Sequence, residues 1–186
     1  MRAICVFCGS SSGNRPDYVE VARAVGRSIA RRGLTLVYGG GKVGLMGAVA
    51  DSALAAGGRV VGVIPQMLLD REVGHPGLSE LHVVTTMSER KLLMGALSDG
   101  FLTLPGGIGT LDELFEAWTW TQLGLHDKPS GLLNYSGYYD QLIQFLDLAV
   151  NEGFQRPRHR AALLVDTEVE SLLDQLLAAA TKAPAA

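Results

Sequence analysis

Two glycine-rich turns carry the clearest chemical signal in the sequence. The first, G-G-G-K-V-G at 39–44, and the second, P-G-G-I-G-T at 105–110, each follow an apolar run and precede a helical pattern. Glycines let the backbone turn sharply and approach a phosphate, while the following helix offers unpaired N–H groups and the positive end of its dipole. Both turns are therefore predicted to cradle an anion.

The first turn does not complete either of the two familiar nucleotide motifs. A dinucleotide site needs an acidic residue about 20 positions further on, at the end of the next strand, to bind a ribose hydroxyl. In this sequence that strand ends in Ile64-Pro65-Gln66. The Walker pattern fails as well, because Lys42 is followed by Val43 rather than by Ser or Thr.

The second turn brings a carboxylate close to the predicted anion cradle. Thr110 and Glu113 form a T-x-x-E pattern, which is typical of a capping box at the start of a helix. The alternative is that Glu113 lies one helical turn beyond a phosphate-sized glycine nest, at the edge of the sheet where ligands bind. We favour this second interpretation, which gives Glu113 a chemical role.

A second T-x-x-E pattern, Thr86 to Glu89, precedes Arg90 and is interpreted as a capping box without chemistry. Arg90 lies three residues before Leu93 and seven before Leu97, and therefore shares the core-facing stripe of the helix. At the start of that helix its planar guanidinium could hold a phosphate or carboxylate with two hydrogen bonds. The structural alternative is a salt bridge to a local acid.

The elements that must position these residues alternate between strands and helices. Short apolar runs predict strands buried on both faces, and amphipathic segments between them predict helices. The fold class is therefore α/β: a single doubly wound, Rossmann-like domain with a mainly parallel sheet and helices on both faces. The predicted strands are Ala3 to Phe7, Leu34 to Tyr38, Val60 to Ile64, His82 to Thr85, Phe101 to Leu104, Gly131 to Asn134 and Ala162 to Val165.

Length favours one nucleotide-binding domain over residues 1–180, followed by a frayed, disordered tail at 181–186. The segment from Pro65 to Glu80 has no clear periodicity and is predicted to be a functional loop over the ligand edge.

Charge and composition limit the class of partner. With a net charge of −3, the chain offers no cationic surface for a nucleic-acid backbone. No apolar run reaches the roughly 18 residues that would span a bilayer. Cys5 and Cys8 form a lone C-x-x-C at the end of a predicted strand, which favours packing over redox or zinc chemistry. A cytoplasmic protein without nucleic-acid or membrane partners is expected.

Four segments together resemble one family, the Lonely Guy (LOG) cytokinin riboside 5′-monophosphate phosphoribohydrolases, whose sequences often carry the label "lysine decarboxylase". They are C-G-S-S at 8–11, Y-G-G-G-K-V-G-L-M-G at 38–47, M-S-E-R-K at 87–91 and P-G-G-I-G-T-L-D-E at 105–113. The resemblance runs from Ile4 to about Leu163. It implies hydrolysis of the N-glycosidic bond of adenosine 5′-monophosphates, with or without an N6 substituent, to free base and ribose 5-phosphate. It also implies a homodimer, with sites near the subunit contact.

By this resemblance, Arg90 and Glu113 form the catalytic pair, and neither a metal nor a cofactor is expected. The resemblance, the two glycine turns and the opening serine motif together give the predicted substrate contacts. These are Ser10, Gly40, Gly41, Glu72, Arg90, Lys91, Gly106, Gly107, Ile108, Gly109, Thr110, Leu111, Asp112, Glu113 and Thr119.

Two rival functions remain at this point. A decarboxylase using pyridoxal phosphate would need a Schiff-base lysine, and the chain has only Lys42, Lys91, Lys128 and Lys182. A carrier or sensor could bind a nucleotide or a nucleotide-like cofactor in the same cleft without cleaving it, because a glycine cradle serves both roles. The pair of Arg90 and Glu113 favours the enzyme, since simple anion binding does not need it.

Overall fold

The computed structural model describes residues 1–71 and 74–182. In this part of the chain seven strands form one sheet in which every recorded pairing is parallel. The strands are β1 (Ala3–Phe7), β2 (Thr35–Tyr38), β3 (Val60–Pro65), β4 (Glu80–Val84), β5 (Phe101–Thr103), β6 (Ser130–Leu133) and β7 (Leu163–Asp166). The α/β class predicted from the sequence is confirmed, and the sheet is fully parallel rather than mainly so.

The strand order, β4-β3-β2-β1-β5-β6-β7, reverses direction between β1 and β5. The chain builds one side of the sheet outward from β1 to β4, returns to pair β5 with β1, and then builds the other side. At such a reversal the loops that leave the two central strands turn to opposite sides. A crevice opens between them at the carboxyl ends of the strands.

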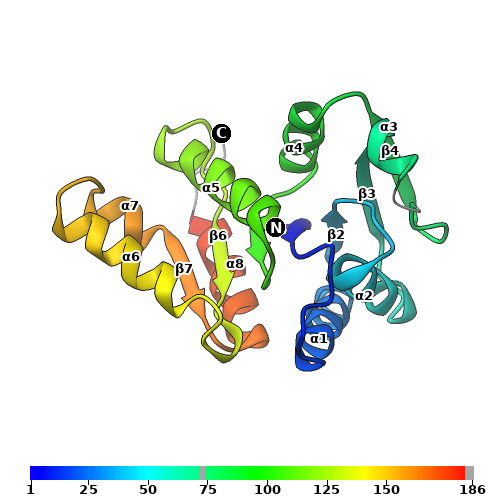
Figure 1. The fold of residues 1–186 in the computed structure, drawn as a ribbon, viewed down its shortest axis with the longest axis horizontal. Coiled ribbons are helices and arrows are strands. Elements are labelled where there is room, and N and C mark those ends of the chain that lie inside the picture. The colour runs from blue at the N-terminus through cyan, green and yellow to red at the C-terminus, as the bar shows by residue number, and fades with distance from the viewer. Residues whose placement is uncertain (72–73, 183–186) are drawn as a thin grey trace.

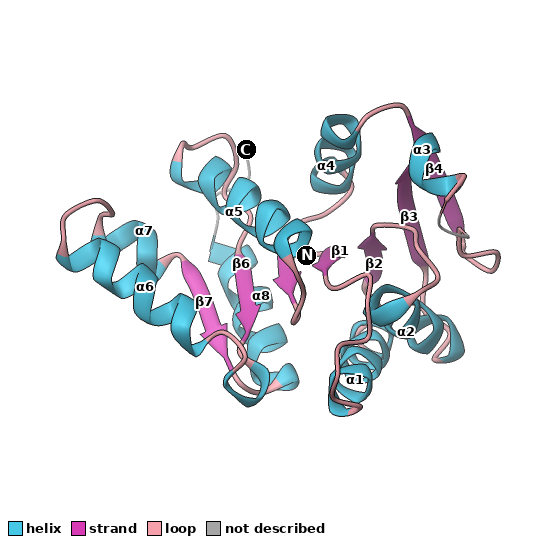
Figure 2. Ribbon diagram, in the orientation of Figure 1, coloured by secondary structure: helices cyan, strands magenta, loops and turns pink. Residues whose placement is uncertain are grey.

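Helices cover both faces of the sheet (Figures 1 and 2). Side chains of α1, α2 and α8 share one core with Ile4, Leu36 and Leu102. On the opposite face α4 and α5 pack on β1 and β3, while α5 and α6 pack on β6 and β7. The helices are α1 (Asp17–Arg31), α2 (Gly44–Ala55), α3 (Gln66–Leu69), α4 (Met87–Ala96), α5 (Ile108–Gln122), α6 (Asp140–Asn151), α7 (Pro157–Ala161) and α8 (Val169–Lys182).

Apart from shifts of one or two residues at strand ends, two segments differ from the sequence prediction. The segment from Pro65 to Glu80, predicted as a loop, contains the short helix α3, and β4 begins at its last residue. Helix α8 continues to Lys182, past the end expected for the domain at residue 180, while residues 183–186 of the expected tail lie outside the described residues.

None of the described helices is both long and apolar enough to cross a membrane.

Candidate active site

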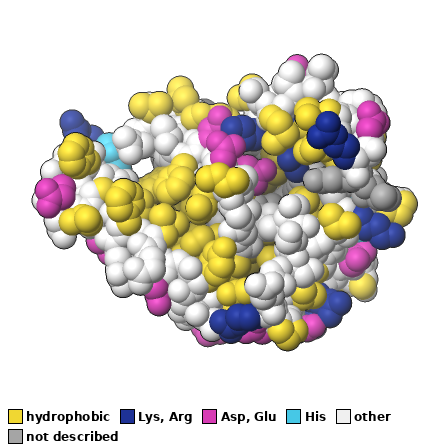
Figure 3. All heavy atoms as spheres, viewed as in Figure 1, with side chains coloured by type: hydrophobic (Ala, Val, Ile, Leu, Met, Phe, Trp, Pro, Cys, Tyr) yellow, Lys and Arg dark blue, Asp and Glu magenta, His cyan; other side chains and the backbone are white. Residues whose placement is uncertain are grey.

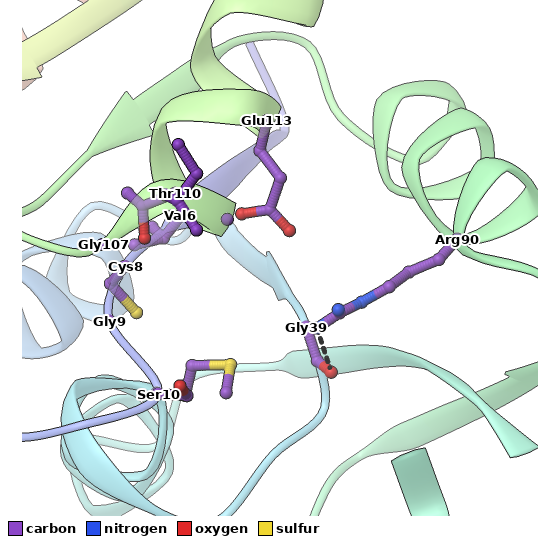
Figure 4. Close-up of a pocket in the computed structure, with 12 residues that line it drawn as sticks. Val6, Cys8, Gly9, Ser10, Gly39, Arg90, Gly107, Thr110 and Glu113 are labelled. Carbon is purple, nitrogen blue, oxygen red and sulfur yellow. Dashed lines mark hydrogen bonds between the residues drawn. The ribbon is translucent and has the colours of Figure 1, made fainter. Parts of the chain in front are cut away.

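A cavity of about 300 Å³ lies where the strand order reverses. Its walls come from the loop after β1, the turn after β2, the first turn of α4 and the first turns of α5 (Figure 4). The lining residues are Val6, Cys8, Gly9, Ser10, Gly39, Met46, Arg90, Gly107, Ile108, Gly109, Thr110 and Glu113.

The second glycine turn leads directly into helix α5. Gly107 is the N-cap in an extended conformation, and within the described residues no side chain caps the helix there. The N–H groups of the first turn, at Ile108, Gly109 and Thr110, are therefore left for a ligand, and all three residues line the cavity. The hydroxyls of Tyr138 and Tyr139 donate to the carbonyl oxygens of Gly106 and Leu104 and hold this turn from outside.

Only one of the two T-x-x-E patterns caps its helix. Thr86 accepts a hydrogen bond from the Glu89 N–H at 3.1 Å, and Glu89 accepts one from the Thr86 N–H at 3.3 Å, which is a complete capping box. Helix α5 starts before Thr110, so the Thr110–Glu113 pair lies inside the helix and caps nothing. The carboxylate of Glu113 instead points into the cavity (Figure 4).

The surroundings of Glu113 change its acidity. Desolvation in the cavity wall raises the pKa of the Glu113 carboxyl to about 7, and the nearby Arg90 guanidinium opposes this rise without cancelling it. A carboxyl with a pKa near neutrality can exchange a proton with a reacting water or leaving group at physiological pH. This property is the expected signature of an acid–base or charge-stabilising residue.

Arg90 enters the cavity from the first half of α4 and is only 6% exposed. Its Nε donates to the Val63 carbonyl oxygen at 3.1 Å, and its Nη2 donates to the Gly39 carbonyl oxygen at 2.9 Å. Within the described residues no carboxylate lies at salt-bridge distance from Arg90, so the structural alternative of a local salt bridge is not observed there. Two backbone carbonyls at the ends of β3 and β2 aim the guanidinium, and its Nη1 donates to the Met87 sulfur at 3.9 Å. The N–H groups that these contacts do not use are available to a ligand.

The aim of Arg90 depends on the absence of a side chain at Gly39. A Cβ on Gly39 would lie 2.0 Å from Nη2 of Arg90 and 3.1 Å from the Met46 sulfur. The first glycine turn thus makes room for the arginine. Gly40, with φ +79°, provides the left-handed residue that the turn requires.

Seven of the predicted contact residues line the cavity: Ser10, Arg90, Gly107, Ile108, Gly109, Thr110 and Glu113. Gly106 lies in an adjoining pocket of about 280 Å³, while Leu111, Asp112 and Thr119 face an outer groove along α5. Gly40 and Gly41 are buried in the turn behind Gly39. Glu72 lies outside the described residues.

Lys91 lies outside the cavity, next to Arg90 in sequence. Its ammonium forms ion pairs with Asp112 and Glu116, both at 3.0 Å, and these pairs tie α4 to α5. They raise the pKa of Lys91 against the opposing effect of desolvation, which keeps the ammonium charged. Nucleotide binding by Lys91, Asp112 and Thr119 remains a prediction.

Sequence reasoning missed part of the apolar wall. Five residues line the cavity although none of them was among the predicted substrate contacts: Val6, Cys8, Gly9, Gly39 and Met46. The signal for Cys8 was its place at the end of β1, next to the strand-order reversal. Burial raises the pKa of the Cys8 thiol well above its ordinary value, so this cysteine contributes an apolar surface rather than a nucleophile.

Comparison with known proteins identifies the family. A family model described as "Possible lysine decarboxylase" matches residues 46–176. The cytokinin riboside 5′-monophosphate phosphoribohydrolase LOG7 of Arabidopsis thaliana is 47% identical over 175 residues, which covers 94% of this chain and 81% of the relative. This chain belongs to the LOG family. The probable LOG-family enzyme LOGL9 of Oryza sativa subsp. japonica is 48% identical, with 94% of this chain and 77% of the relative covered.

Solved structures place the LOG-family chain in a wider fold group. The molybdenum cofactor carrier protein from Chlamydomonas reinhardtii matches with a TM-score of 0.72 and 22% identity, covering 95% of this chain and 98% of that protein. At this level of identity the likeness concerns the fold alone.

The lysines argue against the activity that the family model's description suggests. Lys42 is exposed, Lys91 is ion-paired, and Lys128 donates to the Gly95 carbonyl oxygen at 2.6 Å. None of the described residues that line the cavity is a lysine. A Schiff base to a cofactor at this site would therefore have no lysine to form on.

Proposed function

We propose that this chain hydrolyses the N-glycosidic bond of adenosine 5′-monophosphates, with or without an N6 substituent, and releases free base and ribose 5-phosphate. One observation carries the proposal: Glu113 and Arg90 reach a single cavity from opposite walls, and within the described residues neither caps its own helix nor forms a salt bridge. The names of the LOG relatives, which specify this reaction on cytokinin riboside 5′-monophosphates, support it.

Glu113 would act on the sugar. When the bond between C1′ and the base nitrogen breaks, positive charge develops on the ribose, and an ionised carboxylate beside it stabilises this oxocarbenium-like state. The electrons of the broken bond leave with the base, which takes up a proton from the surrounding water. A water molecule then adds to C1′, and Glu113 accepts its proton and later releases it to solvent. The raised pKa of Glu113 suits this exchange, since the proton can be taken up and released near pH 7.

The start of α5 would hold the 5′-phosphate. The N–H groups that follow Gly107 have no side-chain cap within the described residues, and the helix dipole favours an anion there. Binding energy from the phosphate would fix the ribose against Glu113. Arg90, held by two backbone carbonyls, would keep the nucleotide in register and offset negative charge on the phosphate or the departing base.

We also propose that the chain forms a homodimer through the outer face of α5. Hydrophobic side chains gather over α5 and α6 in Figure 3, and Ile108 is 86% exposed there. The groove along α5 is lined by Ile108, Leu111, Asp112, Phe115, Glu116, Thr119 and Trp120. An apolar surface of this kind beside the cavity suits a second copy of the chain. Light scattering coupled to gel filtration would report a monomer mass if the proposal is wrong.

The expected setting is the cytoplasm. Cys5 and Cys8 are both buried, unbridged thiols, which agrees with a reducing compartment. Fractionation of the source cells with an antibody to the chain would test this expectation.

The experiment that tests the activity is incubation with AMP and with N6-isopentenyladenosine monophosphate, followed by chromatography of the free base. Wild-type protein should release base, and Glu113→Gln should release at least about 100-fold less, because the amide cannot carry the negative charge. Glu89→Gln is the matched control, since Gln also closes a capping box and should keep wild-type turnover. Nucleotide binding without released base would establish the carrier alternative instead.

A further inference from the structure

His75 is a buried polar residue outside the cavity, with an exposed fraction of only 6%. It lies between α3 and β4 and contacts both α2 and the first glycine turn. We propose that His75 is a positioning residue for Arg90, acting through the glycine turn 39–41. This inference rests on the proposed function for its effect on turnover, although its structural part can be tested without catalysis.

The hydrogen bonds of the imidazole fix its tautomer. Nδ1 accepts a hydrogen bond from the Gly77 N–H at 3.2 Å, so this nitrogen carries no proton. Nε2 therefore bears the hydrogen and donates it to Oδ1 of Asp51 on α2, at 2.8 Å. Both ring nitrogens are satisfied, and the ring is fastened at one end to α2 and at the other to its own loop.

The backbone of the same residue is attached to the glycine turn. The His75 N–H donates to the Gly40 carbonyl oxygen at 3.1 Å, and next to it Gly41 and Gly74 form an antiparallel bridge. The side chain holds its own backbone in place through Asp51 and Gly77. The imidazole therefore restrains the position of the glycine turn 39–41 through the backbone of His75.

Two consecutive carbonyl groups of the turn connect His75 to the arginine. The Gly40 carbonyl accepts from His75, and the preceding carbonyl, that of Gly39, accepts from Nη2 of Arg90. The two carbonyls belong to neighbouring peptide planes that meet at the Cα of Gly40, so a change in φ or ψ at Gly40 changes the orientation of the Gly39 oxygen relative to the anchored Gly40 oxygen. Gly40 has φ +79°, a conformation that a glycine leaves easily once the external hydrogen bond is lost. His75 thus supplies a restraint that the glycines themselves cannot.

The test uses four variants: His75→Ala, His75→Gln, Asp51→Ala and the double variant of His75→Ala with Asp51→Ala. For His75→Ala the value of kcat should fall roughly tenfold with a smaller change in KM, since a displaced guanidinium costs orientation more than binding. His75→Gln should recover most of kcat, because its amide can still donate to Asp51. The double variant should be no worse than His75→Ala, because both changes break one link.

A readout that does not depend on turnover separates this inference from the proposed function. In a ¹H–¹⁵N spectrum the Nε–H of Arg90, bonded to the Val63 carbonyl, should give a slowly exchanging signal that Arg90→Lys removes. His75→Ala should shift this signal and speed its exchange, and His75→Gln should preserve it. An unchanged signal, or full kcat in His75→Ala, overturns the inference. Absence of base release by wild-type protein refutes the proposed function alone, and the Arg90 signal then still decides the role of His75.

Discussion

Arg90 and Gly39 are fitted to each other: Nη2 of the arginine donates to the glycine carbonyl oxygen at 2.9 Å, and a Cβ at Gly39 would lie 2.0 Å from that nitrogen. The two residues are far apart in the sequence and come from different sides of β3. Their contact explains why a glycine turn after β2 matters to a side chain that begins on α4.

Replacing Gly39 with alanine should therefore displace Arg90. We expect base release by Gly39→Ala to fall by about 100-fold, because the guanidinium has to leave its two carbonyl partners. Gly95→Ala is the matched control on α4, since its Cβ would meet only a Trp120 ring atom at 3.5 Å, an ordinary contact. Steady-state kinetics would check both, and equal activity of the two variants would contradict the fit.

The activity should depend on pH through Glu113. With its pKa raised to about 7, the carboxyl is protonated below neutrality, and the ionised form proposed to stabilise the sugar cation appears as the pH rises. The expected profile of kcat/KM rises through about pH 7 to a plateau. The substrate phosphate titrates near pH 6 by itself and can also change kcat/KM there. The rise that reports the ionisation of Glu113 is therefore the part of the profile near pH 7. A profile that falls between pH 6.5 and 8 would assign the active form to the protonated carboxyl.

The same carboxyl should influence stability with the opposite sign from an ordinary acid. The pKa of this carboxyl is higher in the folded chain than the ordinary value of 4.5, so the folded state binds the proton more tightly than the unfolded state. The contribution of this carboxyl to the free energy of unfolding is greatest below about pH 4.5 and decreases as the pH rises to about 7. Glu113→Gln removes this loss and should gain about 2 kcal/mol more at pH 8 than at pH 5. Urea unfolding of both proteins at pH 5 and pH 8 would measure this gain. If the free energies of unfolding of Glu113→Gln and wild type differ by the same amount at both pH values, the prediction is refuted.

The two threonines of the T-x-x-E patterns should respond differently to substitution. Thr86→Ala removes the side chain that caps α4 and should lower the free energy of unfolding by about 1 kcal/mol. Thr110 caps nothing in α5, so Thr110→Val, which removes the hydroxyl and keeps the branched shape, should lower the free energy of unfolding by less than Thr86→Ala does. Denaturant titration would compare them. A loss for Thr110→Val as large as that for Thr86→Ala would restore the capping interpretation.

Much of the fold could be read from the sequence because strand apolarity is a local signal. All seven predicted strands agree with the structure to within two residues, including Val60 to Ile64, which lies within β3. Their parallel pairing brought Arg90 and Glu113 to one edge in prediction as in the structure. Segments without a strong periodicity, such as Pro65 to Glu80, gave no such signal, and α3 was missed.

The site was harder to predict where it depends on contacts between distant residues. The T-x-x-E pattern of Thr110 and Glu113 allowed two interpretations, because the sequence does not show that α5 already begins at Ile108, two residues before Thr110. The contact of Arg90 with Gly39, and the ion pairs of Lys91, arise only when separate elements are packed together. Residue types identified the chemistry, and tertiary packing decided which of them share a cavity.

The reversal of strand order between β1 and β5 has a consequence for how the protein gains its activity. Gly39 and Arg90 belong to the half built before the reversal and Glu113 to the half built after it, so neither half contains the complete pair. During refolding, turnover cannot recover until β5 has docked beside β1, a slow step because it closes a long loop of chain. Appearance of enzymatic activity therefore reports that the two halves of the sheet have joined.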